Sequence, residues 1–263
     1  MSCIEIHALS KSYNSVVAVD AVDLNVKSGQ VFGFLGPNGA GKSTLIKLLT
    51  TLIQPNNGTI SVLGINALEE PLEIRKKIGV VLQQPSYEPT LTVEKSLEKY
   101  GMMWNVDKKI RKERTEQLLE SFELTEIRKK NMEDLSIGQR RRGQVAREFM
   151  HDMDLLFVDE PTVGLDPSAR RKLLDFLKNK VKETGMTIFY TTHVLTEAEY
   201  LCDNIAIINN GKIITVDSPN ELKKRFGNEK TVKIHVSVDI KKLETLLQEI
   251  SDYKIEQDEG TTI

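Results

Sequence analysis

One stretch, residues 36–44, constrains this sequence more than any other. It reads Gly-Pro-Asn-Gly-Ala-Gly-Lys-Ser-Thr and fits G-x-x-x-x-G-K-[ST], the loop that surrounds the phosphates of a nucleotide. A short apolar run at 31–35 predicts a buried strand before it. Leucines at helical spacing predict a helix after it: Leu45, Leu48, Leu49 and Leu52. Because this order sets loop amides and the positive end of a helix against an anion, we predict a nucleotide site in an α/β fold.

The residues of this phosphate loop have expected contacts with the nucleotide. Glycines let the backbone approach the phosphates closely. Lys42 would reach the outer phosphates, and the Ser43 hydroxyl would ligate Mg²⁺. The predicted binding residues are Gly36, Pro37, Asn38, Gly39, Ala40, Gly41, Lys42, Ser43 and Thr44.

Charge and hydropathy limit the partners. The chain has 263 residues, with 36 Lys and Arg against 38 Asp and Glu, so its net charge of -2 gives no footprint for nucleic acid. No apolar run approaches the ~20 residues that cross a bilayer, and the first residues lack the pattern of a signal peptide. Cys3 and Cys202 form no metal-type pair, which suits a reducing compartment. We expect a cytoplasmic protein that acts at a membrane only through a partner.

The remaining patterns predict an interrupted α/β domain over 1–218. Alternation over 4–8 and a valine-rich run at 16–26 predict antiparallel strands, and short apolar runs predict further strands at 59–63, 78–82, 155–158 and 187–192. Charged helical patterns, such as 108–122, replace the strands from about 87 to 151, which indicates a helical insert.

Residues typical of turns and of helix ends predict a hairpin, a helix and a separate unit near the end of the chain. Asn-Gly at 210–211, between isoleucine-rich runs, predicts a hairpin. Asp166 and Pro167 are typical of a helix start, and Gly185 of its end. Beyond Pro219, alternation at 232–238 and helical spacing at 243–250 predict a small unit over 219–263 with little room to close its own core.

Two carboxylates follow the buried run at 155–158. Asp159, at the end of a strand, is typical of the Mg²⁺-holding aspartate of phosphate-loop enzymes. Glu160 could polarise an attacking water, a role that typically contributes ~10²–10⁴-fold. An Asp-Glu pair after apolar residues also occurs in solvated turns, so this prediction depends on the phosphate loop upstream.

Three motifs together resemble the ATP-binding cassette family: the phosphate loop, Leu-Ser-Ile-Gly-Gln at 135–139, and the run 155–161. They stand in the family's order, and the resemblance covers residues 4 to 216. The segment 159–167 is similar to the ATP-binding subunits of drug-resistance (daunorubicin type) and sodium-extrusion exporters, whose membrane domain is a separate chain. The implied fold is a RecA-like phosphate-loop NTPase core with an antiparallel β subdomain, a helical insert and a small α+β C-terminal extension.

The resemblance implies roles for four residues outside the phosphate loop and the carboxylate pair. Tyr13 matches the aromatic that stacks on adenine, and Gln83 matches the glutamine that senses Mg²⁺ and joins the core to the insert. His193 matches the histidine that contacts the γ-phosphate, and Asp166 lies in the loop that communicates across a dimer. An ordinary strand aromatic and a structural histidine are the alternatives for Tyr13 and His193.

The motif at 135–139 resembles the family signature, usually Leu-Ser-Gly-Gly-Gln. Ser136 and Gln139 fit a capping box that opens a helix, and such a capped N-terminus also binds an anion. The resemblance implies that Ser136, Gly138 and Gln139 contact ATP held by a second subunit. Ile137 replaces a glycine; because a β-branched residue is costly at positive φ, we expect ordinary backbone angles there. The arginines at 140–142 are interpreted as a solvated helix face.

These features predict an ATP-binding and ATP-hydrolysing subunit that uses ATP and Mg²⁺. The resemblance implies a homodimer, a separate integral-membrane permease, and peripheral attachment to the cytoplasmic face of the membrane. Glu160, His193, Gln83 and Lys42 are the expected catalytic residues, and Ser43, Gln83 and Asp159 the expected metal residues. Two alternatives stay open: a soluble cassette ATPase of the iron–sulfur assembly type, and a regulatory nucleotide-binding module, for which Ile137 is the hint.

Overall fold

The computed structural model describes residues 2–84 and 86–226 of the chain. Residues up to Lys223 form one compact unit, and a second unit begins at Lys224. The strand predicted over 232–238 and the helix predicted over 243–250 lie outside the described residues. The boundary predicted after residue 218 therefore stays a prediction.

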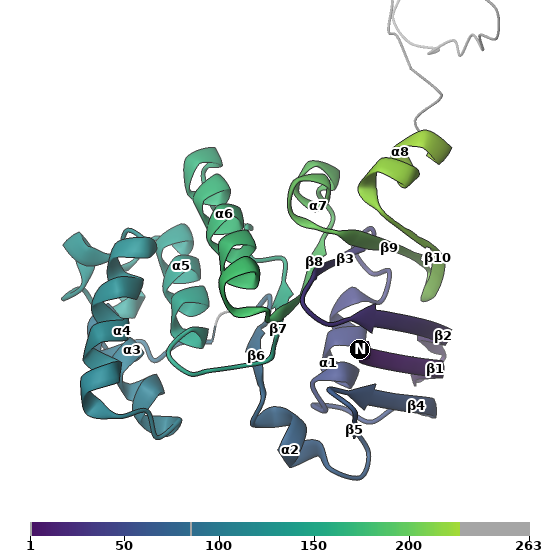
Figure 1. Ribbon diagram of the computed structural model, residues 1–263, viewed down its shortest axis with the longest axis horizontal. Helices are drawn as coiled ribbons and strands as arrows, with labels where there is room; N and C mark the ends of the chain where they lie inside the picture. The colour runs from purple at the N-terminus through teal and green to yellow at the C-terminus, as the bar shows by residue number, and fades with distance from the viewer. Residues whose placement is uncertain (1, 85, 227–263) are drawn as a thin grey trace, which may run out of the picture. The chain divides into compact units, whose positions relative to one another are not determined.

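An antiparallel sheet carries the N-terminal part of the chain. Within the described ranges it has four strands in the order β2-β1-β4-β5 (Figure 1). Their bounds are Ser2–Tyr13 (β1), Val16–Lys27 (β2), Asn57–Val62 (β4) and Ile65–Asn66 (β5). The run at 16–26 forms one strand, in which a backbone kink at Ala21, with φ of 46°, shifts the alternation of buried residues. Buried Val19 precedes the kink and buried Val22 follows it.

A mostly parallel sheet forms the centre of the unit. Among the described residues its order is β10-β9-β3-β8-β7-β6, with β10 antiparallel to β9 and the other neighbours parallel. The bounds are Val31–Leu35 (β3), Ile78–Val81 (β6), Leu155–Asp159 (β7), Thr187–Thr192 (β8), Asn204–Asn209 (β9) and Lys212–Asp217 (β10). The predicted hairpin is β9–β10, and its turn residues Asn210 and Gly211 both have positive φ.

Successive residues of the central strands face two different hydrophobic cores, because side chains alternate across a sheet. Leu155 and Phe157 of β7 pack in a core with α1 and the antiparallel sheet. Leu156 and Val158 pack in the other core, with helices α5, α6 and α7. Both faces of β7 are thus covered, which explains its uninterrupted apolar run.

Helices flank the sheet and form the insert. Their bounds are Lys42–Leu49 (α1), Pro71–Arg75 (α2), Val93–Met103 (α3), Lys108–Ser121 (α4), Ile137–Glu148 (α5), Pro167–Thr184 (α6), Leu195–Leu201 (α7) and Pro219–Phe226 (α8), with single 3₁₀ turns at Thr125–Ile127 (η1) and Met132–Asp134 (η2). Helix α1 ends before Leu52, which is exposed, so the predicted apolar stripe is shorter by that residue.

The predicted helical insert comprises α3, α4 and α5, which lie together on the left of Figure 1. Phe122, just after α4, and Phe149, just after α5, both pack on Phe176 of α6, with ring centroids 4.5 and 4.9 Å away. These aromatic contacts attach the insert to the helix that follows the carboxylate pair. The fold confirms the predicted α/β class with an antiparallel subdomain and a helical insert.

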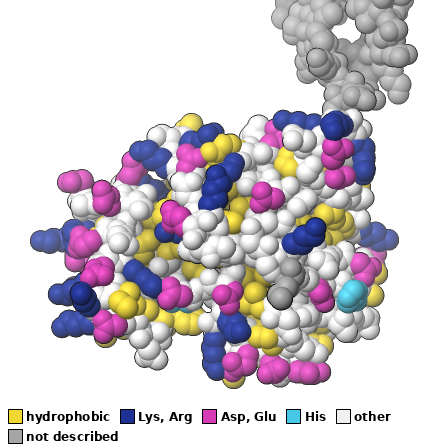
Figure 2. Space-filling model, viewed as in Figure 1, with side chains coloured by type: hydrophobic (Ala, Val, Ile, Leu, Met, Phe, Trp, Pro, Cys, Tyr) yellow, Lys and Arg dark blue, Asp and Glu magenta, His cyan; other side chains and the backbone are white. Residues whose placement is uncertain are grey.

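The surface is charged and mixed. Figure 2 shows basic and acidic side chains interspersed over the face in view, as the near-balanced composition implies. In the ranges 2–84 and 86–226, no helix combines the length and the apolarity that a membrane span requires.

Candidate functional site

The carboxyl ends of four parallel strands meet at one edge of the central sheet. The phosphate loop follows β3, Gln83 follows β6, Asp159 ends β7 with Glu160 next to it, and His193 follows β8. Strand register aligns these ends, since Leu35 pairs with Thr192 and Asp159 pairs with Thr191. Ligands of open parallel sheets bind at this edge, so topology alone places these segments where a site is expected.

The phosphate loop packs closely against the backbone of β9 and β2. A Cβ atom at Gly36 would lie 2.4 Å from the carbonyl oxygen of Ile208, and one at Gly41 would lie 2.3 Å from that of Ala18. Gly41 also has φ of 109°, so only glycine suits both its space and its backbone. It is the N-cap of α1 and offers no side chain to the first amides of the helix. Those amides suit a bound anion such as a phosphate.

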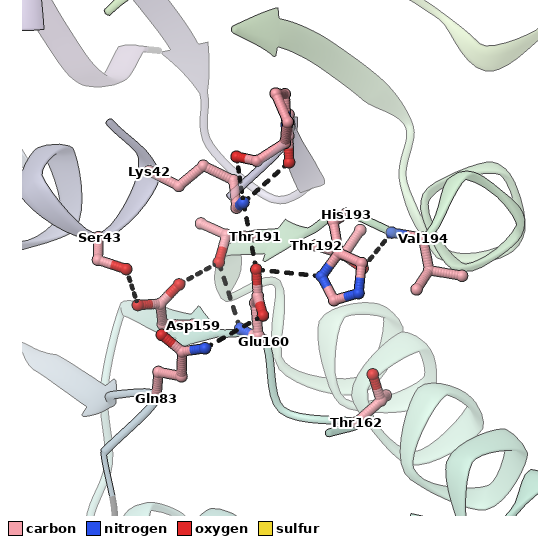
Figure 3. A network of polar contacts seen from close by, with 12 residues as sticks. Lys42, Ser43, Gln83, Asp159, Glu160, Thr162, Thr191, Thr192, His193 and Val194 are labelled. Atoms are coloured by element: carbon pink, nitrogen blue, oxygen red, sulfur yellow. Dashed lines mark hydrogen bonds and ion pairs between the residues drawn. The ribbon is translucent and has the colours of Figure 1, made fainter. Parts of the chain in front are cut away.

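Lys42 lies folded into the loop and is only 5% exposed. Its ammonium donates to the carbonyl oxygens of Gly36, at 2.8 Å, and of Pro37, at 3.1 Å. It also forms an ion pair with Oε1 of Glu160 at 3.2 Å (Figure 3). The cation predicted for the phosphates is thus held at the carboxylate predicted as the base.

Ser43 and Asp159 form the candidate metal site. The Ser43 hydroxyl donates to Oδ2 of Asp159 at 2.7 Å, and the Thr191 hydroxyl donates to Oδ1. A hydroxyl and one carboxylate suit Mg²⁺, which prefers oxygen ligands and usually takes few from the protein. In the part of the chain that the structure describes, no group of three or more His, Cys, Asp and Glu side chains could hold a metal. Phosphate oxygens and water would supply the other ligands.

Glu160 is the centre of the cluster. Oε1 lies 3.2 Å from Nδ1 of His193, and Oε2 accepts from Nε2 of Gln83 at 3.3 Å (Figure 3). Its backbone has φ of 46°, a left-handed conformation that non-glycine residues rarely adopt. Its amide donates to the carbonyl oxygen of Thr191 at 3.1 Å, which holds the turn. The structure therefore brings all four predicted catalytic residues together.

Arg141 corrects the prediction of a solvated arginine face. Its side chain is buried and donates to three carbonyl oxygens, those of Leu82, Asp159 and Pro161. Burial lowers the pKa of Arg141 to about 10, so the guanidinium still carries its charge at neutral pH. It joins α5 to the strand ends before Gln83 and after Asp159. The sequence did contain a signal for this burial: Arg141 stands four residues before buried Val145, and residues at that spacing lie on one face of a helix.

The signature motif forms the predicted capping box. The Ser136 hydroxyl accepts from the backbone amide of Gln139 at 3.2 Å, and the side-chain oxygen of Gln139 accepts from the backbone amide of Ser136 at 3.0 Å. Ile137 is the first residue of α5 and is not at positive φ, as its β-branched side chain required. A Cβ at Gly138 would lie 2.8 Å from the carbonyl oxygen of Gly164, so this glycine is needed for close packing.

The signature and two other predicted residues lie outside the cluster around Glu160. Figure 1 places α5 within the insert, away from α1. Asp166 caps α6 by accepting from the Ala169 amide at 2.9 Å, and this hydrogen bond lowers the pKa of Asp166. Tyr13 lies at the end of β1 and is 45% exposed, with Lys11 Nζ 5.6 Å from its ring centroid. Ser136, Gly138, Gln139, Tyr13 and Asp166 are therefore available only for contacts beyond this cluster.

Comparison with known proteins gives a consistent set of matches. A family model described as ABC transporter matches residues 19–163, more than half of the chain, and a model described as an AAA domain matches residues 131–196. The linearmycin resistance ATP-binding protein of Bacillus subtilis is 38% identical over 229 residues, 87% of this chain and 73% of that protein. The daunorubicin/doxorubicin resistance ATP-binding protein of Streptomyces peucetius is 38% identical over 260 residues, 98% of this chain and 78% of that protein.

Solved structures show the same fold. A dimeric ATP-binding cassette in a post-hydrolysis state, bound to ADP and Pi, superposes with a TM-score of 0.77 at 26% identity, covering 82% of this chain and 98% of that one. This likeness confirms the fold class expected from the sequence.

Proposed function

Because this chain belongs to the ABC transporter family and is an ATP-binding, ATP-hydrolysing subunit of that family, we propose that it drives export by closing, as a pair of copies, on two ATP molecules. The observation that supports this most directly is the convergence of Lys42, Glu160 and His193 beside the Ser43–Asp159 pair. That cluster contains a cation for phosphate, a carboxylate for water and a polar pair for a metal ion.

The chemistry follows from the positions of these side chains. Glu160 would accept a proton from the water that attacks the γ-phosphate, and His193, whose Nδ1 lies beside Oε1 of Glu160, would contact that phosphate. Lys42 would leave its carbonyl partners for the phosphate oxygens and stabilise their charge. Ser43, Gln83 and Asp159 would hold Mg²⁺, which neutralises charge on the β- and γ-phosphates when bound. Tyr13, exposed at the end of its strand, would stack on adenine.

One copy would provide only half of each site. The capped N-terminus of α5 suits an anion but lies away from the phosphate loop, so its Ser136, Gly138 and Gln139 would face the γ-phosphate held by a second copy. Asp166 lies in the loop whose Gly164 packs against Gly138. This loop would therefore move when the two copies close on ATP. The dimeric arrangement of the solved cassette supports this proposal.

The transported class and the partner are inferred from relatives. The two relatives above are named for resistance to linearmycin and to daunorubicin and doxorubicin, which supports an exporter. A separate integral-membrane permease would then supply the pathway, and this chain would attach peripherally to the cytoplasmic face. The same relatives favour this function over an iron–sulfur assembly ATPase. Ile137 no longer supports the regulatory alternative, because this residue occupies an ordinary helical position.

Replacing Glu160 tests the proposed chemistry. Glu160→Gln keeps the shape of the side chain but removes the base and the negative charge that pairs with Lys42, so we expect turnover to fall by at least ~100-fold while ATP binding persists. The bound ATP should hold the two copies together, so gel filtration with ATP should show a dimer and with ADP a monomer. Glu73→Gln, the same change at an exposed carboxylate, is the control and should leave both readouts unchanged. Normal turnover by Glu160→Gln would refute the assignment of the base.

A further inference from the structure

A further buried carboxylate, that of Glu197 on α7, has no part in the chemistry above. It is 2% exposed. Its Oε1 accepts from the Thr162 hydroxyl at 2.8 Å, and its Oε2 accepts from the Tyr190 hydroxyl at 2.8 Å and the Thr192 hydroxyl at 2.9 Å. Arg170 of α6 lies 3.4 Å from Oε1.

This arrangement is costly unless every contact is kept. A buried carboxylate loses its hydration, and only good hydrogen bonds and a nearby cation offset that loss. Three hydroxyl donors and Arg170 meet that requirement here. An apolar side chain would fill the same space without these partners, so the carboxylate calls for an explanation beyond packing.

The positions of the hydroxyl donors in the chain show which segments the Glu197 carboxylate holds together. Thr162 lies two residues after Glu160, in the loop that leaves β7. Thr192 directly precedes His193, its hydroxyl also accepts from the Val194 amide at 2.9 Å, and its carbonyl oxygen accepts from the Gly36 amide at 3.4 Å. One carboxylate therefore ties the segment of Glu160 to the segment of His193.

We propose that Glu197 is a positioning residue that fixes Glu160 and His193 relative to each other. The proposal rests on the roles proposed above for those two residues, whose side chains lie 3.2 Å apart. Catalytic groups must hold a precise geometry, and displacements of about 1 Å can cost on the order of 100-fold in rate. The phosphate-binding side chain of Lys42 has its own contacts to Gly36 and Pro37, which do not involve Glu197.

Replacing Thr162 by valine tests this proposal most directly, because the substitution removes the threonine hydroxyl with little change in shape. We expect Thr162→Val to lower kcat by about tenfold or more at an unchanged KM for ATP, because geometry changes and binding does not. Thr162→Ser restores the hydroxyl and should restore kcat. Melting temperature is measured on every variant, together with binding of a non-hydrolysable ATP analogue.

Tyr190→Phe is the matched control. It removes a hydroxyl donor from the same carboxylate, but Tyr190 lies within β8, where pairing with β3 and β7 holds its backbone, whereas Thr162 lies in the loop after Glu160. We expect it to lower the melting temperature about as much as Thr162→Val does, with kcat within about twofold of the wild type. This difference between two equally destabilised variants is what a purely structural role would not give.

The outcomes separate the two proposals. If Thr162→Val keeps kcat within about twofold, or if Tyr190→Phe loses as much kcat as Thr162→Val, Glu197 does not position the site. If Glu160→Gln itself turns over at the normal rate, the proposed roles fail, and the positioning proposal fails with them. Loss of turnover in Glu160→Gln together with an active Thr162→Val refutes the positioning proposal alone.

Discussion

At the scale of single residues, the ion pair between Lys42 and Glu160 joins two opposite charges inside the protein. Both side chains are nearly fully buried, and each carries a charge that water no longer stabilises. Removing one partner leaves the other charge buried and uncompensated, which is more costly than removing both. The left-handed backbone of Glu160 adds strain of ~1–3 kcal/mol, of the kind that persists where surrounding contacts enforce it.

A double-mutant cycle measures that coupling. We expect Lys42→Met and Glu160→Gln to be coupled by ~1–3 kcal/mol in the free energy of unfolding, without nucleotide, because the double variant leaves no unpaired charge. Urea unfolding of the four proteins gives the value. The control cycle is Lys76→Met with Glu73→Gln, whose atoms are closer, at 2.6 Å, but exposed. That cycle should give under about 1 kcal/mol, and equal coupling in the two cycles would contradict the argument from burial.

The same scale shows which site residues a sequence can predict. Lys42, Ser43 and Asp159 were predictable because each follows from a local pattern, a glycine loop or the end of an apolar strand. For Arg141 the local signal was only its spacing from buried Val145. The partners of Arg141 and Glu197 are carbonyl and hydroxyl groups from segments distant in the sequence, which local patterns do not show. A charged side chain predicts exposure unless its tertiary partners are known. Arg141 was therefore misassigned to a solvated face.

At the scale of elements, α5 contacts the central sheet through a charged side chain near each end. Arg141, in its second turn, donates to carbonyl groups at the ends of β6 and β7. Glu148, its last residue, accepts from the Val80 amide at 3.3 Å and from the Tyr100 hydroxyl at 2.7 Å, both at Oε2. Strand β6 is the edge of the sheet among the described residues, and the Glu148 carboxylate accepts a backbone amide of that strand. The helix that carries the signature is thus fastened to the strand that leads to Gln83.

Glu148 makes this attachment dependent on pH. Burial raises the pKa of Glu148 above that of an ordinary glutamate, so the folded state binds the proton more tightly than the unfolded state. This contribution lowers the free energy of unfolding as pH rises from the ordinary carboxyl pKa toward the folded one, by at most ~1.4 kcal/mol per pH unit. Glu148→Gln removes it, and one amide oxygen can accept both hydrogen bonds now made to Oε2.

We therefore expect the stability of Glu148→Gln relative to wild type to increase as pH rises above the ordinary carboxyl pKa. Urea unfolding of both proteins at several pH values above that pKa gives the difference in free energy. Glu120→Gln, at an exposed position on α4, is the control and should give a constant difference. A constant difference for Glu148→Gln as well would show that the carboxylate does not titrate differently in the folded state.

At the scale of the whole molecule, topology separates two surfaces that both suit phosphate. One is the sheet edge, where parallel strands bring the phosphate loop, the carboxylates and His193 together, and this arrangement was predictable from strand order. The other is the capped N-terminus of α5, whose distance from that edge depends on how the insert packs against α6. Local patterns predicted the capping box but not this separation, because it is set by contacts among Phe122, Phe149 and Phe176.

Mixing inactive copies tests whether two chains complete each site. Lys42→Ala should fail at the phosphate loop, and Ser136→Arg should fail at the capped helix. In a random mixture, half of the pairs contain one copy of each, and one of their two sites then has both Lys42 and Ser136 intact. We expect roughly a quarter of wild-type ATPase activity to return. The control mixes Lys42→Ala with Glu160→Gln: both defects lie in the same half-site, so no pair has an intact site and activity should stay absent. Recovery in neither mixture would mean that one chain completes its own site, and the homodimer proposal would fall.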